Sequence, residues 1–313
     1  MSDTLRLESD ALRVVLDPGR GCDILSVVDA RTGIDVLYST PWRERADAIR
    51  AGQQAPISSD SVDSWMEQYR GGWQTLCPNA GPPRGYNGAT LGFHGEASVV
   101  PWTVLRADSA SASLRVELFS VPLVIERTVA VEGSSLRLVD VLTNTSTAPI
   151  VVDYSNHPAF GGLFLDAPCT VDTNASTFVT DPDFGGERLP WPSGLDSLPG
   201  PGLPSGRFGW LTGFDGEGDT AAWASVTNPD VDLSVRLSWD PRRLPYAWWW
   251  QEFNNTQGFP WFGRARVFAI EPASMQTGGP ARASVTELPA KGSVRIPVRL
   301  EVNRATELEQ DSD

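Results

Sequence analysis

Only two histidines occur in the 313 residues, and both stand in surroundings that suit a binding site. His94 closes a glycine-rich segment that starts at Gly71, and the glycines beside it let the backbone approach a ligand closely. An imidazole can give or take a proton near neutral pH, so His94 is a candidate for acid–base or binding chemistry. A turn histidine with a local hydrogen bond is the alternative that its spacing leaves open.

His157 closes a second segment of interest, residues 150–157. Alternation with a period of two places Val151, Asp153, Ser155 and His157 on one face of a strand, and that face becomes polar toward its end. Such a gradient is expected where a strand leaves the core and lines a cleft. A capped strand end would show the same gradient, and we favour the cleft.

Glu271 is a carboxylate candidate at the end of an alternating segment, residues 264–272. The residues on its own face are small or aliphatic, which leaves room beside the carboxylate, whereas the bulky residues between them point toward a core. Pro272 has no N–H to donate and ends the strand ladder there. The alternative is a solvated glutamate at a strand end.

An aromatic segment, residues 246–252, offers surfaces for a flat ligand. In a strand Trp249 faces opposite to Trp248 and Trp250, so one set can join the core while the other is exposed in a cleft. Aromatic faces suit the C–H faces of a pyranose, and Gln251 or Glu252 could bind hydroxyls. We predict Trp249 and Glu252 as sugar contacts, although simple core packing explains most tryptophans.

Short alternating segments supply the elements that position these residues, and turns interrupt them about every eight to twelve residues. This rhythm predicts an all-β sandwich or barrel, with helix confined to residues 42–51 and 61–70. Residues 181–220, rich in Gly and Pro, predict a long functional or capping loop within one domain, 1–306, followed by an acidic, disordered tail, 307–313. The predicted strands are 5–8, 11–16, 24–28, 34–38, 98–106, 112–118, 123–131 and 135–143.

Composition narrows the function classes further. A hydrophobic content of 41% predicts a buried core, and the absence of a long apolar run argues against a membrane span and a secretory signal, so we expect a cytoplasmic protein. A net charge of −14 argues against nucleic acid. Three scattered cysteines suggest no disulfide framework, and two distant histidines without acidic partners at ligand spacing make a poor metal site. The oligomeric state stays open.

Four motifs, in order, resemble those of the aldose 1-epimerase (galactose mutarotase-like) family and related hexose-phosphate epimerases. The resemblance covers about residues 10–300 and implies a galactose-mutarotase-like β-sandwich, or supersandwich, with few short helices. Ala159 departs from it, because many members have an aromatic there. The motifs are the glycine-rich loop at 71–81, the HG motif at 92–98, the NHxxF motif at 155–160 and the LEP-type segment at 269–272.

The resemblance also implies a chemistry, which is interconversion of the α and β anomers of an aldose without a cofactor. Glu271 would be the base that takes the proton from the anomeric hydroxyl, and His157 the acid that protonates the ring oxygen. After ring opening, rotation about C1–C2 and reclosure give the other anomer. Arg70 and Arg84 compete for the arginine of the approach loop. The residues expected to bind the sugar are His94, Asn79, Gln74, Arg70 and Arg84, beside Trp249 and Glu252.

Three other functions compete with this one. The first is an epimerase of an anionic sugar, either a hexose 6-phosphate or a sulfonated sugar, because arginine forks suit such groups. The second is a non-catalytic sugar-binding module, against which the presence of both His157 and Glu271 speaks. The third is a glycosidase or lyase, which needs two carboxylates. The candidate arginines are Arg70, Arg84, Arg264 and Arg266, and the candidate carboxylates Glu67, Glu96 and Glu252.

Overall fold

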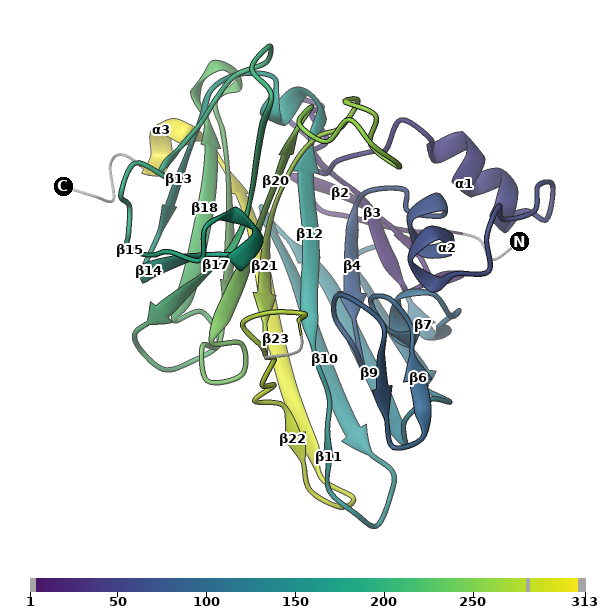
Figure 1. Cartoon of the computed structure of the whole chain (residues 1–313). Coiled ribbons are helices and arrows are strands. Elements are labelled where there is room, and N and C mark those ends of the chain that lie inside the picture. Colours follow the sequence, from purple (N-terminus) through teal and green to yellow (C-terminus); the bar gives the residue numbers. More distant parts are fainter. Residues whose placement is uncertain (1–3, 280–281, 309–313) are drawn as a thin grey trace.

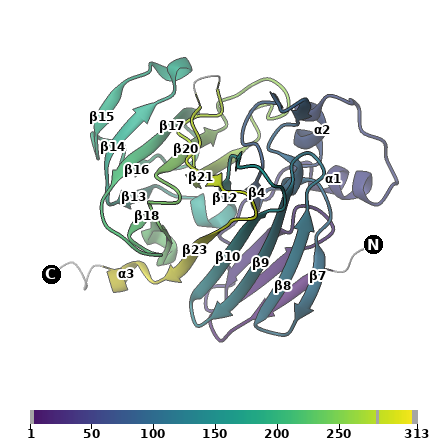
Figure 2. The ribbon, with the colours of Figure 1, turned by 90° about the horizontal axis from the view of Figure 1, so that it is seen from below.

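The computed structural model describes residues 4–279 and 282–308. It consists mainly of antiparallel strands in two large sheets, which are viewed from two directions in Figures 1 and 2. The first sheet has ten strands, in the order β1 (Leu5–Glu8), β2 (Leu12–Asp17), β3 (Asp23–Asp29), β4 (Trp73–Leu76), β12 (Ser155–Gly161), β21 (Arg266–Ala273), β20 (Tyr246–Phe253), β17 (Ser205–Phe214), β14 (Ala175–Thr180) and β15 (Arg188–Pro190).

The second sheet has nine strands and covers the inner face of the first. Two small two-stranded sheets complete the β structure, β5 (Arg84–Tyr86) with β6 (Ala89–Leu91), and β11 (Ile150–Val151) with β22 (Glu287–Leu288). The order in the nine-stranded sheet is β16 (Ser197–Leu198), β13 (Cys169–Thr173), β18 (Ala222–Asn228), β19 (Leu233–Trp239), β23 (Ser293–Asn303), β10 (Ser135–Asn144), β9 (Leu123–Glu132), β8 (Ser111–Glu117) and β7 (Thr103–Ala107).

Helices are few and short. α1 (Arg43–Arg50) and α2 (Ser61–Glu67) lie beside β2 to β4, and α3 (Ala305–Leu308) lies beside the second sheet (Figure 1). Among the described residues, no helix combines the length and the apolar character needed to cross a membrane. Single 3₁₀ turns cover Glu96–Ser98, Gly162–Leu165, Pro182–Phe184 and Pro229–Val231.

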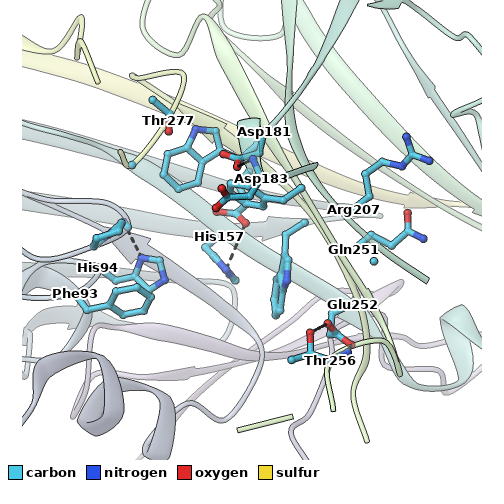
Figure 3. Close-up of a pocket in the computed structure, with 18 of the residues that line it drawn as sticks. Phe93, His94, His157, Asp181, Asp183, Arg207, Gln251, Glu252, Thr256 and Thr277 are labelled. Carbon is cyan, nitrogen blue, oxygen red and sulfur yellow. Dashed lines mark hydrogen bonds and ion pairs between the residues drawn. The ribbon is translucent and has the colours of Figure 1, made fainter. Parts of the chain in front are cut away.

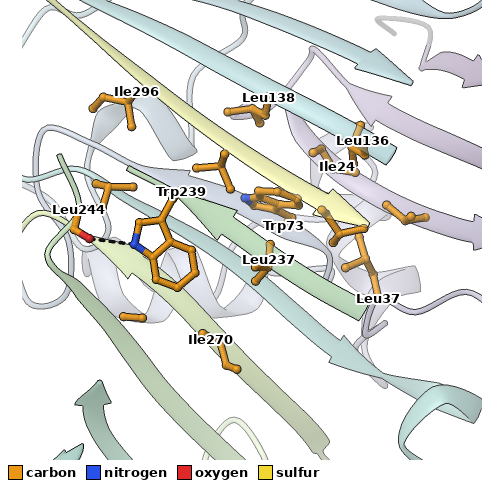
Figure 4. Close-up of a cluster of buried hydrophobic side chains, with 14 of the residues drawn as sticks. Ile24, Leu37, Trp73, Leu136, Leu138, Leu237, Trp239, Leu244, Ile270 and Ile296 are labelled. Atoms are coloured by element: carbon orange, nitrogen blue, oxygen red, sulfur yellow. Dashed lines mark hydrogen bonds between the residues drawn. The ribbon is translucent and has the colours of Figure 1, made fainter. Parts of the chain in front are cut away.

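The core lies between the two large sheets and contains residues of both. Trp73 of the first sheet and Trp239 of the second are each at most 1% exposed and lie in the same cluster (Figure 4). The indole N–H of Trp239 donates to the Leu244 carbonyl at 2.9 Å, so the buried polar atom of this ring is satisfied. The predicted β-sandwich is thereby confirmed.

A chain of buried hydrogen bonds crosses this core. Arg127 on β9 forms two bonds with the Asp140 carboxylate on β10, at 2.8 and 2.7 Å, and the Tyr154 hydroxyl donates to the same carboxylate at 2.8 Å. Asn156 donates to the Tyr154 hydroxyl at 3.2 Å and accepts from the Trp73 indole at 2.9 Å. These bonds tie the second sheet to β12.

The predicted strands are mostly found, with three corrections. Residues 34–38 form only isolated bridges, because the Asp35 side chain takes the N–H groups of Val27 and Leu37. Residues 98–106 contribute a strand only from Thr103, after a 3₁₀ turn. The long loop 181–220 contains the ten-residue strand β17, in which Gly209 is required because a Cβ there would lie 2.3 Å from the Val179 carbonyl.

The predicted tail begins inside an element. Residues 307 and 308 end α3, and residues 309–313 lie outside the described part of the chain. The single domain 1–306 stays a prediction, and the two large sheets share one hydrophobic cluster, which accords with it.

Candidate active site

A cavity of about 490 Å³ opens on the outer face of the ten-stranded sheet. Its size falls within the usual range for small-molecule sites, about 300–1,000 Å³. The side chains around it come from α2, the HG segment and several strands, and Figure 3 shows how they surround His157. The aromatic residues that line the cavity are Trp65, Tyr69, Phe93, Phe208, Trp248, Trp250 and Trp261.

His157 and Glu271 face each other at the floor of this cavity. They stand on the paired strands β12 and β21, whose register places Ser155 opposite Ala273 and Ala159 opposite Ala269. The Nε2 of His157 lies 3.4 Å from Oε1 of Glu271, and both residues line the cavity while being at most 5% exposed. The two predicted catalytic residues therefore meet in one place.

Burial governs the protonation of this pair because a low-polarity environment disfavours the charged form of each group. Burial lowers the pKa of His157 to about 4 and raises the pKa of the Glu271 carboxyl well above its usual value. Between these two values the pair retains one exchangeable proton and carries no net charge. Such a pair can give one proton and take another in the same step.

His94 lies beside the pair, with its ring centroid 5.8 Å from that of His157. The backbone N–H of Gly81 donates to its Nδ1 at 3.1 Å, so Nδ1 is an acceptor and the ring proton sits on Nε2. Burial, and then the charge of His157, hold the pKa of His94 well below its usual value. His94 is therefore a neutral hydrogen-bond donor at the cavity wall.

The loop that carries His94 is held in an uncommon backbone conformation. His94 itself has a φ of 60°, in the left-handed region that non-glycine residues seldom adopt. Gly95 follows with a φ of 78°, and a Cβ there would lie 2.4 Å from the Cys77 carbonyl. Strained residues of this kind collect at functional sites, where the surrounding structure enforces them.

Asn79 was predicted to bind substrate, but its side chain instead holds the loop that carries His94. Its Nδ2 donates to the carbonyls of Gly81, Pro82 and Gly92, at 3.3, 3.1 and 2.9 Å, and the side chain is fully buried without lining the cavity. Asn79 thus fixes the segment whose Gly81 N–H sets the tautomer of His94.

Glu252 lines the opposite wall, as Figure 3 shows. Its Oε1 accepts the backbone N–H groups of Asn255 and Thr256, at 2.7 and 2.9 Å, and Oε2 accepts the Thr256 hydroxyl at 2.5 Å. Three donors from one turn hold the carboxylate still. Glu252 therefore combines a structural role in this turn with a place on the cavity wall.

Trp249 is a correction to the sequence analysis. It is 1% exposed and packs against Phe268 at 4.6 Å in the core between the sheets. The cavity side of β20 carries Trp248 and Trp250 instead, whose positions alternate with that of Trp249. The alternation predicted that Trp249 lies on the opposite face from Trp248 and Trp250, but it did not predict which face lines the cavity.

Gln74 and the two predicted arginines also lie outside the cavity lining. Gln74 is buried and donates to the Gly71 carbonyl at 2.8 Å. Arg70 is buried in an ion-pair cluster, with its closest contact to Asp17 at 2.7 Å. Arg84 contacts the carboxylate of Asp153 at 3.4 Å and the Asn79 side chain at 3.0 Å.

Several lining residues were missed by the sequence analysis. Asp60 caps the N-terminus of α2 by accepting the N–H groups of Val62 and Asp63, and this helix directs Trp65 to the cavity with Tyr69 four residues later. That i, i+4 aromatic spacing on a predicted helix was an available signal. Other missed residues include Asp181, Asp183, Arg207, Trp261 and Thr277.

Within residues 4–279 and 282–308, no three His, Cys, Asp or Glu side chains gather in a way that could hold a metal ion. The chemistry that this arrangement supports with its own side chains is proton transfer by His157 and Glu271, on a ligand that lies against aromatic rings. His94 adds one fixed donor.

Comparison with known structures places the fold in the galactose mutarotase-like class. Slr1438 from Synechocystis sp. PCC 6803 has a TM-score of 0.70 at 20% identity, over 97% of this chain and 96% of that one. A galactose mutarotase related enzyme from Lactobacillus acidophilus has 0.67 at 14%, over 96% and 97%. The GalM/aldose epimerase homologue from C. elegans has 0.66 at 15%, over 97% and 99%.

The chain belongs to the family described as "Domain of unknown function (DUF4432)", whose model matches residues 2–302. No curated protein matches the sequence. The chain therefore belongs to this family and has a galactose mutarotase-like fold.

Proposed function

We propose that the protein is an aldose 1-epimerase that interconverts the α and β anomers of a sugar. The observation that carries the proposal is the opposition of His157 and Glu271, with 3.4 Å between Nε2 and Oε1, at the floor of an aromatic cavity. An imidazole and a carboxylate in such a place suit general acid–base catalysis, which typically contributes about a hundred- to ten-thousandfold for each group.

The proposed reaction uses the single exchangeable proton of the pair, which rests on Glu271 and moves to His157 when the sugar binds. Glu271 then takes the proton of the anomeric hydroxyl while His157 gives one to the ring oxygen, and the bond between C1 and that oxygen breaks to leave an open-chain aldehyde. Rotation about C1–C2 presents the other face of the aldehyde to the same hydroxyl. Reclosure returns both protons, with the two residues exchanging roles, so the pair ends as it began.

The charges around the cavity favour a neutral aldose over the anionic alternative. Three carboxylate residues besides the neutral acid–base pair line it, whereas none of Arg70, Arg84, Arg264 and Arg266, the arginines considered as anion anchors, does. Arg207 is the single arginine in the lining of the described cavity, and its side chain points away from His157 (Figure 3). An anionic substituent would therefore meet like charge without a cation aimed at it.

The carboxylates considered for a glycosidase are engaged elsewhere. Glu67 is buried outside the cavity and bonds to Arg45 at 2.8 Å, and Glu96 accepts the backbone N–H groups of Phe119 and Ser120. Glu252 does line the cavity, but three donors of one turn surround its carboxylate. The pair of free carboxylates that glycoside hydrolysis uses is not formed by these residues.

The test is the rate at which freshly dissolved single anomers of neutral aldoses equilibrate, followed by polarimetry or NMR. The wild-type protein should accelerate at least one of them, and His157→Gln and Glu271→Gln should each abolish the acceleration. Glu126→Gln, which removes an exposed carboxylate from β9, is the matched control and should keep full activity. Sugar binding without any acceleration would replace the proposal with a non-catalytic binding module.

A further inference from the structure

Tyr69 lines the cavity and carries a hydroxyl group that the proposed acid–base pair does not use. The residue lines the cavity and is 3% exposed, and its hydroxyl has no hydrogen-bond partner among the residues that the structure describes. A buried hydroxyl without a partner costs free energy, and most such groups in proteins are satisfied. A ligand oxygen in the cavity would supply the missing partner.

The ring of Tyr69 is held firmly in place. It stacks on Trp65 with 4.9 Å between centroids and an angle of 20°, and it meets the His157 ring edge-on at 6.1 Å. Its backbone is fixed as well, because the Thr40 hydroxyl donates to the Tyr69 carbonyl at 3.0 Å. The phenol is therefore a rigid group beside the proposed acid.

The phenol also lies close enough to the proposed base to interact with its charge. Burial raises the pKa of Tyr69 well above its usual value, and the nearby Tyr38 and Glu271 raise it further. The hydroxyl consequently keeps its proton at any pH at which the protein works. A group in that state can donate a hydrogen bond to an oxygen that gains negative charge.

We propose that Tyr69 is a further catalytic residue, whose hydroxyl donates a hydrogen bond to the C1 oxygen of the bound aldose. This inference rests on the proposed epimerase function. When Glu271 removes the proton of the anomeric hydroxyl, the C1 oxygen gains negative charge and becomes the oxygen of the aldehyde. A fixed donor aimed at that oxygen stabilises the transition state more than the ground state.

Tyr38 provides a matched control in the same aromatic cluster. Its hydroxyl is likewise without a partner in the described part of the chain, and it is 5% exposed, but the residue does not line the cavity. Removing the hydroxyl from either tyrosine removes a single atom and leaves the ring packing intact. The two variants thus differ in whether the altered residue lines the cavity.

The experiment measures kcat, KM and Tm for wild type, Tyr69→Phe and Tyr38→Phe, with an aldose that the wild type converts. We expect Tyr69→Phe to lower kcat by about ten- to a thousandfold, as loss of one such donor does, with a KM within about threefold of wild type. Its Tm should not fall, because the lost hydroxyl has no protein partner. Tyr38→Phe should keep the wild-type kcat.

Wild-type kcat in Tyr69→Phe would overturn the inference and leave the epimerase proposal standing. An equal loss of kcat in both variants would also overturn it, since the effect would then come from the packing of the aromatic cluster. If the wild type converts no aldose, the proposed function fails and the inference fails with it.

Discussion

His157 and Glu271 stand opposite each other on adjacent strands, and each keeps one polar atom without a partner among the described residues, Nδ1 in His157 and Oε2 in Glu271. Two opposed groups that both resist charging hold one proton between them more stably than either would hold a charge alone. Because the pair holds this shared proton, both the activity and the stability of the protein should depend on pH.

The rate of anomer conversion should follow a bell-shaped pH profile. Activity needs one exchangeable proton in the pair, so kcat/KM should fall on the acid side near pH 4, where His157 also becomes protonated. On the alkaline side it should fall where the Glu271 carboxyl ionises, above its ordinary pKa. The measurement is polarimetry from pH 3.5 upward with the uncatalysed rate subtracted. An acid limb near the usual histidine pKa of about 6.5 would contradict it.

The same two groups should give stability slopes of opposite sign. The folded pKa of His157 is depressed to about 4, so its contribution is present above about pH 6.5 and is lost as the pH falls through the folded pKa, by about 3 kcal/mol in all. The folded pKa of Glu271 is raised, so its contribution is present below the unfolded pKa of about 4.3 and is lost as the pH rises through the folded pKa.

Urea unfolding of three variants separates these slopes. Relative to the double variant His157→Gln/Glu271→Gln, the free energy of unfolding of Glu271→Gln should rise from pH 4 to 6.5. That of His157→Gln should fall over the same range, because only the buried carboxyl remains. Subtracting the free energy of unfolding of the double variant removes the contribution of all other titrating groups. If the free energies of unfolding of the three proteins changed in parallel with pH, the opposite pKa shifts of His157 and Glu271 would be refuted.

The tautomer of His94 is a third prediction. Because Gly81 N–H donates to Nδ1, the ring should carry its proton on Nε2 and stay neutral well below pH 6.5. Long-range ¹H–¹⁵N NMR reports the state of each nitrogen, and with only two histidines the His157→Gln variant assigns the spectrum. A proton on Nδ1 would break the proposed link from Asn79 through Gly81 to His94.

Local patterns and the motif resemblance together located the centre of the site. Alternation placed His157 on a face that becomes polar toward its end and Glu271 on a face of small or aliphatic residues. The prediction that Pro272 ends the second strand was wrong, because β21 continues through Pro272 to Ala273. These signals work because strand faces are decided by nearest neighbours along the chain. The β-sandwich followed from the same rhythm.

The misassigned residues depend on partners far away in the sequence. Arg70 forms ion pairs with Asp17 and Asp23, some fifty residues earlier in the chain, and does not line the cavity. No local sequence pattern predicts such an ion pair. The face of Trp249 was decided by packing against Phe268 on the neighbouring strand. Contacts of this kind, between residues far apart in the sequence, could not be predicted from local patterns.

The buried pair of Arg127 and Asp140 should respond differently to single and double replacement. Asp140→Leu would leave the Arg127 guanidinium buried without its carboxylate and should lower the free energy of unfolding by about 3–5 kcal/mol. Arg127→Met with Asp140→Leu removes both charges and should cost less than either single change. Urea unfolding gives these values, and additive losses would contradict the idea that an uncompensated charge dominates.

Substrate charge provides the last prediction, and it follows from the cavity wall. Asp181, Asp183 and Glu252 line the cavity beside the neutral pair of His157 and Glu271, whereas Arg207 points away from His157 (Figure 3). A neutral aldose should therefore be converted with a kcat/KM at least tenfold higher than its 6-phosphate or 6-sulfonate. Added salt screens the repulsion between like charges, so it should reduce the difference in kcat/KM between the neutral sugar and the anionic one.

Replacement of the rim acids tests whether these charges cause the discrimination. Asp181→Asn and Asp183→Asn together should raise kcat/KM for the 6-phosphate and leave the value for the neutral sugar nearly unchanged, because the acid–base pair is formed by His157 and Glu271 alone. Arg207→Gln is the matched control and should change neither value, since its side chain points away from the reacting atoms. If Arg207→Gln instead abolished conversion of a phosphorylated sugar, the arginine would be an anion anchor after all, and the neutral substrate class would have to be abandoned.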